Sequence, residues 1–157
     1  LAPAALQIDL ESRRVRAAGK EFSLPPAELA LLSVFARRAL RGEAPLAAPA
    51  KELPDTEWKQ RYLVELRWIA GPLGDLGETE RALRQGMDGS DFSAHLSKLK
   101  KLLRRELGPA AGPYLISDGG SRPRRYSLGL RPAAVSYDPF QAPRQIGAII
   151  SSISPGA

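Results

Sequence analysis

The sequence predicts an α+β fold in which N-terminal antiparallel strands precede three main helices and a C-terminal β-hairpin. Short alternating runs occupy the first 24 residues, and apolar residues then recur at helical spacing in three segments. Two strand-like runs joined by a turn rich in Gly, Pro and Arg follow. We assign residues 1–131 to this domain, with an enlarged insertion at 42–89, and residues 132–157 to a C-terminal extension or tail.

Composition excludes several classes of protein. The 157 residues suit one domain, and the lack of cysteine excludes thiol catalysis, disulfides and thiolate zinc sites. No apolar run approaches the roughly 20 residues of a membrane span, so we expect a cytoplasmic protein with no membrane partner. Because the chain starts at Leu1 rather than methionine, we expect a segment of a larger protein whose N-terminal sensor domain is missing.

Positive charge is concentrated in one part of the chain. Residues 90–131 contain nine basic and three acidic side chains, an excess equal to the net charge of +6 of the whole chain. A concentrated basic surface attracts phosphate polymers or acidic partners, although a charge run is also typical of a solvated helix face.

The first 42 residues predict a three-stranded meander and a helix. Strands are expected at 7–10, at 14–17 and around Phe22 and Leu24, with turns between them. The helix begins at Pro25 or Pro26, because proline is tolerated in a first helical turn, and it ends at Gly42. Its apolar residues recur at helical spacing: Leu29, Leu32, Phe35, Ala36, Ala39 and Leu40.

The middle of the chain predicts a loop at 43–54 and a second helix capped by Asp55. This helix carries an inward stripe of Trp58, Tyr62, Leu63, Leu66 and Ile69. Trp68 lies off the stripe, and we predict that it is a surface interaction residue. A glycine-rich connection follows, with a short helix expected at 79–85.

The third helix is expected to have one apolar face and one basic face, with Ser90 or Asp91 as its N-cap. The apolar arc comprises Phe92, Leu96, Leu99, Leu103 and Leu107, widened by Leu102. The opposite side carries Ala94, Ser97, Lys98, Lys101, Arg104 and Arg105. The lone histidine, His95, lies at the margin of the stripe and is interpreted as a packed or capping residue, because no second histidine accompanies it.

A β-hairpin with a basic tip follows. Strands are expected at 114–117 and 125–130, joined by the turn "DGGSRPR". A further strand-like run at 146–153 could dock on the domain, contact another molecule or remain a tail.

Three motifs resemble the OmpR/PhoB-type effector domain, a winged helix-turn-helix. The third helix "AHLSKLKKLL" is similar to the recognition helix of that family, "LPPAELALL" to the entry into its first helix, and "YLISDGGSRPRRYSLGL" to its wing. The resemblance covers roughly residues 6–130.

The resemblance implies a nucleic-acid interface on the third helix and the wing. Ser93, Ala94, Ser97, Lys98 and Lys101 would face the major groove or its phosphates, and Arg122 would enter the minor groove. The remaining cations expected at phosphates are Arg104, Arg105, Arg124 and Arg125.

The sequence departs from that family in two features, and it also resembles a narrower group of proteins. The start of the third helix, "MDGSDFSA", is acidic and small, and the connection between the first and third helices is long. The long insertion and the ending "RRYSLGLRPAAV" resemble the C-terminal winged helix of CRISPR-associated proteins that carry a CARF nucleotide-sensing domain, which act in antiviral defence.

We therefore expect a non-catalytic C-terminal module that binds nucleic acid weakly and without sequence specificity, that mediates interaction or self-association, or both. The alternative is a sequence-specific DNA-binding effector domain of a two-component-type transcriptional regulator. An enzyme is the weakest hypothesis, since carboxylate pairs such as Glu78 and Glu80, or Asp88 and Asp91, have no accompanying histidine. No cofactor and no metal are expected.

Overall fold

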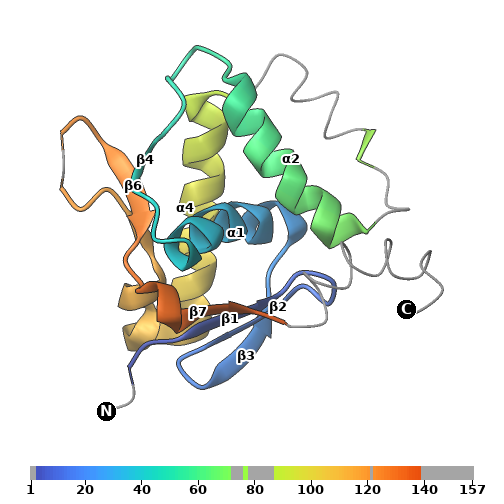
Figure 1. Ribbon diagram of the computed structural model, residues 1–157, viewed down its shortest axis with the longest axis vertical. Coiled ribbons are helices and arrows are strands. Elements are labelled where there is room, and N and C mark those ends of the chain that lie inside the picture. Colours follow the sequence, from blue (N-terminus) through green and yellow to red (C-terminus); the bar gives the residue numbers. More distant parts are fainter. Residues whose placement is uncertain (1–2, 72–75, 78–86, 121, 139–157) are drawn as a thin grey trace.

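The computed structural model describes residues 3–71, 76–77, 87–120 and 122–138 (Figure 1). Seven strands, three α-helices and two 3-10 helices lie in this part of the chain. The fold is mixed α and β, with three helices and antiparallel strands, as the sequence predicted. The predicted short helix at 79–85 and the strand-like run at 146–153 lie outside the described residues.

A four-stranded sheet forms one side of the domain. Its members are β1 (Leu6–Asp9), β2 (Arg14–Ala17), β3 (Lys20–Ser23) and β7 (Val135–Tyr137), in the order β3-β2-β1-β7. The first three form the predicted meander, with Ile8 opposite Val15 and Val15 opposite Phe22. Ala18 and Gly19 join β2 to β3 with φ of 52° and 75°, the backbone of a tight hairpin turn.

Strand β7 was not predicted from the sequence. It runs parallel to β1, with Leu6 opposite Val135 and Ile8 opposite Tyr137. Residues 135–137 therefore belong to the sheet rather than to a tail, and the folded unit extends past the boundary set at residue 131. Only three residues form this strand, so no alternating pattern was long enough to reveal it.

The helix α1 (Pro26–Leu40) occupies the centre of the domain. It begins after Pro25 with proline in its first turn, and it ends near Gly42, whose φ is 67°. All residues from Glu28 to Ala36 are buried. A helix that is buried on every side needs neighbours on every side, and α1 packs against α2, α4, β6 and β7.

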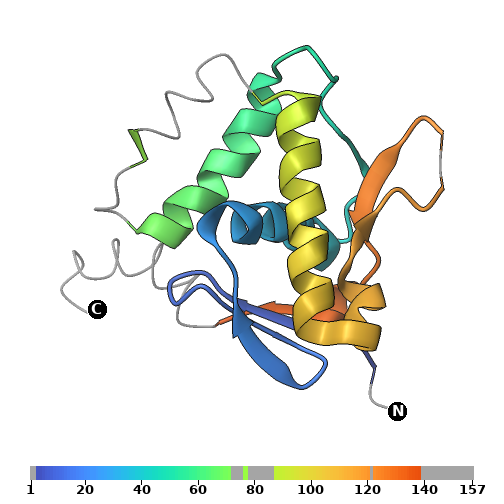
Figure 2. The same cartoon turned by 180° about the vertical axis from the view of Figure 1, so that it is seen from behind.

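Two further helices flank α1 (Figures 1 and 2). In α2 (Thr56–Ala70), the Asp55 carboxylate accepts a hydrogen bond from the Trp58 amide at 3.0 Å, which is the predicted N-cap. The longest helix is α4 (Gly89–Leu107). Backbone hydrogen bonds of 3.0 and 3.1 Å between Asp55 and Met87 place the starts of α2 and α4 side by side.

A small second sheet contains the predicted hairpin. Its strands are β4 (Leu46–Ala47), β5 (Ile116–Ser117) and β6 (Arg125–Leu128), in the order β4-β6-β5. Two details of the sequence prediction were wrong. The expected loop at 43–54 contains β4, and Tyr114 lies in the 3-10 helix η1 (Gly108–Tyr114) rather than in a strand. The Tyr114 hydroxyl accepts hydrogen bonds from the Ala5 and Ala18 amides, which explains its different environment.

Within the described ranges, no helix combines the length and apolar character that crossing a bilayer requires.

The apolar arc of α4 generates a stability prediction. Leu99 is fully buried and Lys101 is exposed on the same helix. We expect Leu99→Ala to lower the free energy of unfolding by about 2–5 kcal/mol, because it leaves a cavity in a closed core. Lys101→Ala is the control, and urea denaturation measures both. Equal effects at the two positions would show that the helix face is assigned wrongly.

Candidate nucleic-acid interface

The helix α4 presents the predicted interface from a rigid base. Phe92, Leu96, Leu99, Leu103 and Leu107 are all buried, as predicted. At the C-terminal end of α4, Lys20 of β3 donates a hydrogen bond to the Glu106 carbonyl at 2.8 Å and lies 3.4 Å from the Glu106 carboxylate. The helix is therefore held by its apolar face and at its C-terminal end, which leaves its opposite face to solvent.

The start of α4 differs from the prediction. The N-cap is Asp88, not Ser90 or Asp91: its carboxylate accepts from the Asp91 amide at 2.9 Å, and the Asp91 carboxylate accepts from the Asp88 amide at 3.2 Å. This capping box satisfies two backbone donors. A Cβ at Gly89 would lie 2.8 Å from both the Lys51 Cα and the Pro49 carbonyl oxygen, so only glycine fits here. The small, acidic start of the helix thus has a structural reason.

All ten predicted nucleic-acid contacts are exposed. On α4 these are Ser93, Ala94, Ser97, Lys98, Lys101, Arg104 and Arg105, and beside the hairpin turn they are Arg122, Arg124 and Arg125. The Lys98 side chain is 61% exposed, and its Nζ lies 3.9 Å from the buried carboxylate of Glu28.

The hairpin lies directly beside α4, as Figure 2 shows. The rings of Phe92 on α4 and Tyr126 on β6 are 5.1 Å apart in an edge-to-face contact. In the turn, Asp118 accepts from the Gly120 amide at 2.9 Å and lies 3.5 Å from Arg124 and 3.8 Å from Arg122. The Gly120 hydrogen bond, followed by the charges of Arg124, Arg122 and Lys100, lowers the pKa of Asp118. Because Lys100 belongs to α4, the charge of the helix reaches Asp118 in the turn.

A buried carboxylate lies beneath the basic face of α4. Glu28 is 1% exposed, and its Oε2 lies 3.1 Å from Nδ1 of His95. Its Oε1 receives no hydrogen bond from the described residues. The ring of His95 also stacks on Tyr62 with centroids 5.7 Å apart, which agrees with its interpretation as a packed residue. Burial, with the charges of Glu28 and Asp91, raises the pKa of Tyr62.

A second buried carboxylate, Glu65, joins α1 to α2. It accepts a hydrogen bond from Ser33 at 2.7 Å and forms a 2.6 Å ion pair with Nε of Arg37. The Arg37 guanidinium lies 4.5 Å from the Tyr137 ring centroid and 5.9 Å from that of Trp68. Trp68 is half-buried beside this network, away from α4.

Sequence reasoning missed both carboxylates. The signal was present for Glu28, because it occupies a position on the apolar stripe of "AELALL". A carboxylate on a buried stripe needs a cation or a donor from another element.

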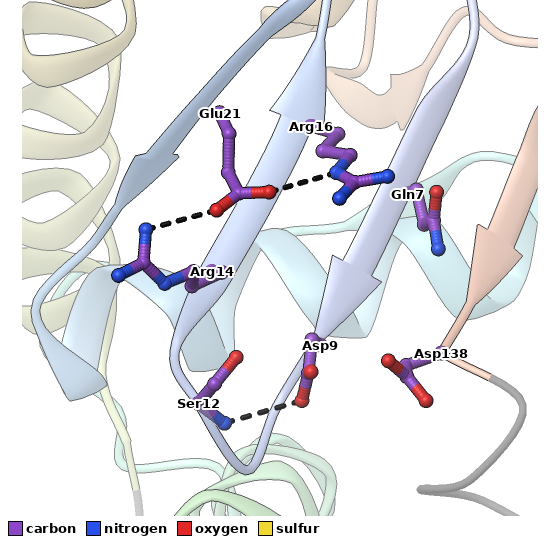
Figure 3. A pocket seen from close by; sticks show the side chains of 7 residues that line it. All are labelled: Gln7, Asp9, Ser12, Arg14, Arg16, Glu21 and Asp138. Atoms are coloured by element: carbon purple, nitrogen blue, oxygen red, sulfur yellow. Dashed lines mark hydrogen bonds and ion pairs between the residues drawn. The ribbon is translucent and has the colours of Figure 1, made fainter.

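The outer face of the four-stranded sheet carries a hollow of about 180 Å³ (Figure 3). Glu21 bridges Arg14 at 2.9 Å and Arg16 at 2.8 Å, and the Arg16 hydrogen bond is the main cause of a lowered pKa of Glu21. Asp9 accepts from the Ser12 amide at 3.1 Å. Opposite charges neutralise one another on this face, so it offers a nucleic acid no excess of cations.

Within the described ranges, no group of three or more His, Asp or Glu side chains could hold a metal ion.

Comparison with known proteins found no match: no family model, no curated protein and no solved structure matches the chain.

The Glu28–His95 contact generates a prediction. His95→Ala removes the nearest donor from a buried carboxylate, and we expect it to lower the free energy of unfolding by about 1–3 kcal/mol. The double variant Glu28→Leu/His95→Ala should recover much of this loss, because no buried charge remains. Chemical denaturation of the two single variants and the double variant measures the coupling, and strict additivity would show that the contact has no energetic weight.

Proposed function

We propose that the exposed face of α4 and the β5–β6 hairpin form one polyanion-binding surface, through which this winged-helix module binds nucleic acid mainly by its phosphates. The observation that supports the proposal is that seven cations are exposed on two elements that touch each other through the rings of Phe92 and Tyr126. These are Lys98, Lys101, Arg104 and Arg105 on α4, and Arg122, Arg124 and Arg125 beside it. A helix with its apolar face buried and its basic face exposed suits a groove lined by phosphates.

Slight sequence specificity follows from the start of α4. Helix-turn-helix proteins contact base edges from the N-terminal residues of the recognition helix. Here this end holds a capping box and a glycine packed on the backbone of residues 49–51. The exposed candidates nearby are Ser93, Ala94 and Ser97, and none can make the bidentate contact of an arginine to guanine.

Weak affinity follows from the charge pairing in the turn. Asp118 lies within ion-pair distance of Arg122 and Arg124, which lowers the net charge that the hairpin offers. The nearby Glu28 carboxylate offsets part of the positive charge of Lys98. The cations whose charge is best placed for phosphates are therefore Lys101, Arg104 and Arg105.

For the whole protein we propose, on the sequence resemblance alone, a non-catalytic C-terminal module of a CRISPR-associated CARF-type protein. The full open reading frame tests this: a CARF domain upstream supports it, and a phosphoacceptor domain upstream supports a transcriptional regulator instead.

Two matched variants test the proposed binding mode. Lys101→Ala should weaken binding to unrelated duplexes by similar factors and reduce the slope of log K against log salt by about 1, since one phosphate contact is lost. Arg67→Ala removes an equal charge from the exposed surface of α2 and should change neither quantity. Fluorescence anisotropy between about 50 and 200 mM salt gives both slopes. Binding that ignores salt, or equal effects of the two variants, would refute the proposed surface.

Specificity has its own test. Selection from a pool of random duplexes should return no motif, because phosphate contacts carry no base information. Recovery of a sharp half-site that is lost on Ser97→Ala would instead establish the sequence-specific regulator.

A further inference from the structure

A second basic surface lies between α1 and α2, and no residue of α4 or of the hairpin lines it. It is a groove of about 490 Å³ lined by Val34, Arg37, Arg38, Arg41, Glu43, Arg61, Val64, Glu65 and Trp68. We call this set the α1–α2 groove. Four arginines and two glutamates line it, so the groove carries an excess of positive charge.

The two helices line the groove with the same spacing. Val34, Arg37, Arg38 and Arg41 follow an i, i+3, i+4, i+7 pattern on α1, and Arg61, Val64, Glu65 and Trp68 follow it on α2. Such a pattern is one continuous helix face. The two faces meet where α1 and α2 pack, and a hollow between helix faces is a surface on which an amphipathic helix can dock.

The arginines of the groove differ in how far they are neutralised. Arg37 is held by Glu65 at 2.6 Å, and Arg38 by Glu43 at 2.9 Å and the Ala44 carbonyl at 2.7 Å. Among the described residues, the ion pair of Arg61 is a 3.7 Å contact with Glu57, a side chain that is 84% exposed, and such exposed pairs are weak. The Arg41 side chain forms no ion pair within the part of the chain that the structure describes. Arg41 and Arg61 therefore offer charge to an acidic partner.

The groove also has an apolar part on α2. Val64 is 51% exposed, and Trp68, four residues further along α2, is half-buried. Trp and Arg around an exposed apolar centre are the residue types that dominate binding energy at protein interfaces. The groove is partly open to solvent, which favours a peptide over a small molecule that needs enclosure.

We propose that the α1–α2 groove is a docking site for an acidic amphipathic helix of a partner protein, whose apolar residues contact Val64 and Trp68 and whose carboxylates pair with Arg41 and Arg61. This binding activity is separate from the proposed binding of nucleic acid by α4. It also gives Trp68 the interaction role that the sequence predicted, with an acidic helix as the partner.

A peptide selection tests the proposal. A display library of random peptides about 12 residues long, enough for three helical turns, is panned on the wild-type chain. It is counter-selected on the double variant Arg41→Glu/Arg61→Glu. We expect enriched peptides that carry acidic residues beside Leu, Phe or Trp at helical spacing. The double variant should bind them at least about tenfold more weakly, because reversed charges repel the carboxylates.

Arg67→Glu is the matched control, because it reverses an exposed charge on α2 outside the groove. Val64→Asp tests the apolar contact independently of the arginines, and thermal melts verify that each variant is folded. Trp68 fluorescence should change on binding, whereas Trp58 is 2% exposed and should contribute little.

Four results would overturn the proposal, and three of them concern peptide binding. These are a selection without enrichment, enriched peptides without acidic residues, and equal binding to the double variant and to Arg67→Glu. A loss of duplex binding in Arg41→Glu/Arg61→Glu as large as that of α4 variants would assign the groove to the nucleic-acid surface and also overturn it. The α4 proposal fails separately, if duplex binding ignores salt or if Lys101→Ala and Arg67→Ala bind duplex equally, and neither result bears on peptide binding in the groove.

Discussion

The side chain of Phe92 holds the candidate interface together. Its ring contacts Trp58 of α2 at 5.2 Å, Tyr126 of β6 at 5.1 Å and Phe35 of α1 at 6.3 Å. One aromatic residue from each of four elements thus meets at the first turn of α4. Aromatic clusters of this kind bury large areas and fix ring geometry, so they set how α4 lies relative to the hairpin. The ring of Phe92 therefore joins α4 to the hairpin whose turn carries the other predicted cations.

One buried carboxylate lies beside each of the two basic surfaces. Glu28 lies beneath α4 beside His95 and Lys98, and Glu65 lies between α1 and α2 beside Arg37. A buried carboxylate is costly unless cations or donors surround it, so each one restricts where the neighbouring basic side chains lie. The cations further along each helix face, such as Lys101 and Arg41, then extend into solvent.

Sequence periodicity predicted the long elements well. The meander, the limits of α1, the Asp55 cap of α2 and the complete buried stripe of α4 all follow from apolar spacing and turn residues, and the structure confirms them. Each of these features is local, since every residue in the pattern lies within a few turns of the next.

The features that the sequence did not reveal depend on contacts between distant residues. Strand β7 is defined by its pairing with β1, more than 120 residues earlier in the chain. The N-cap is Asp88 instead of the predicted Ser90 or Asp91, and the adjacent Gly89 packs on the backbone of residues 49–51. The buried Glu28 and Glu65 are paired with His95 and Arg37, which come from other helices. Tertiary partners of this kind leave no periodic signal.

The central claim is that the basic face of α4 and the hairpin turn act as a single surface for phosphates. The most direct measurement is a titration of the isotopically labelled chain with a short duplex, followed by amide chemical shifts. We expect shifts to concentrate on the exposed positions of α4 and on residues 118–125, while the outer face of the sheet and the α1–α2 groove stay unchanged. Shifts centred on the sheet or the groove, with α4 unaffected, would contradict it.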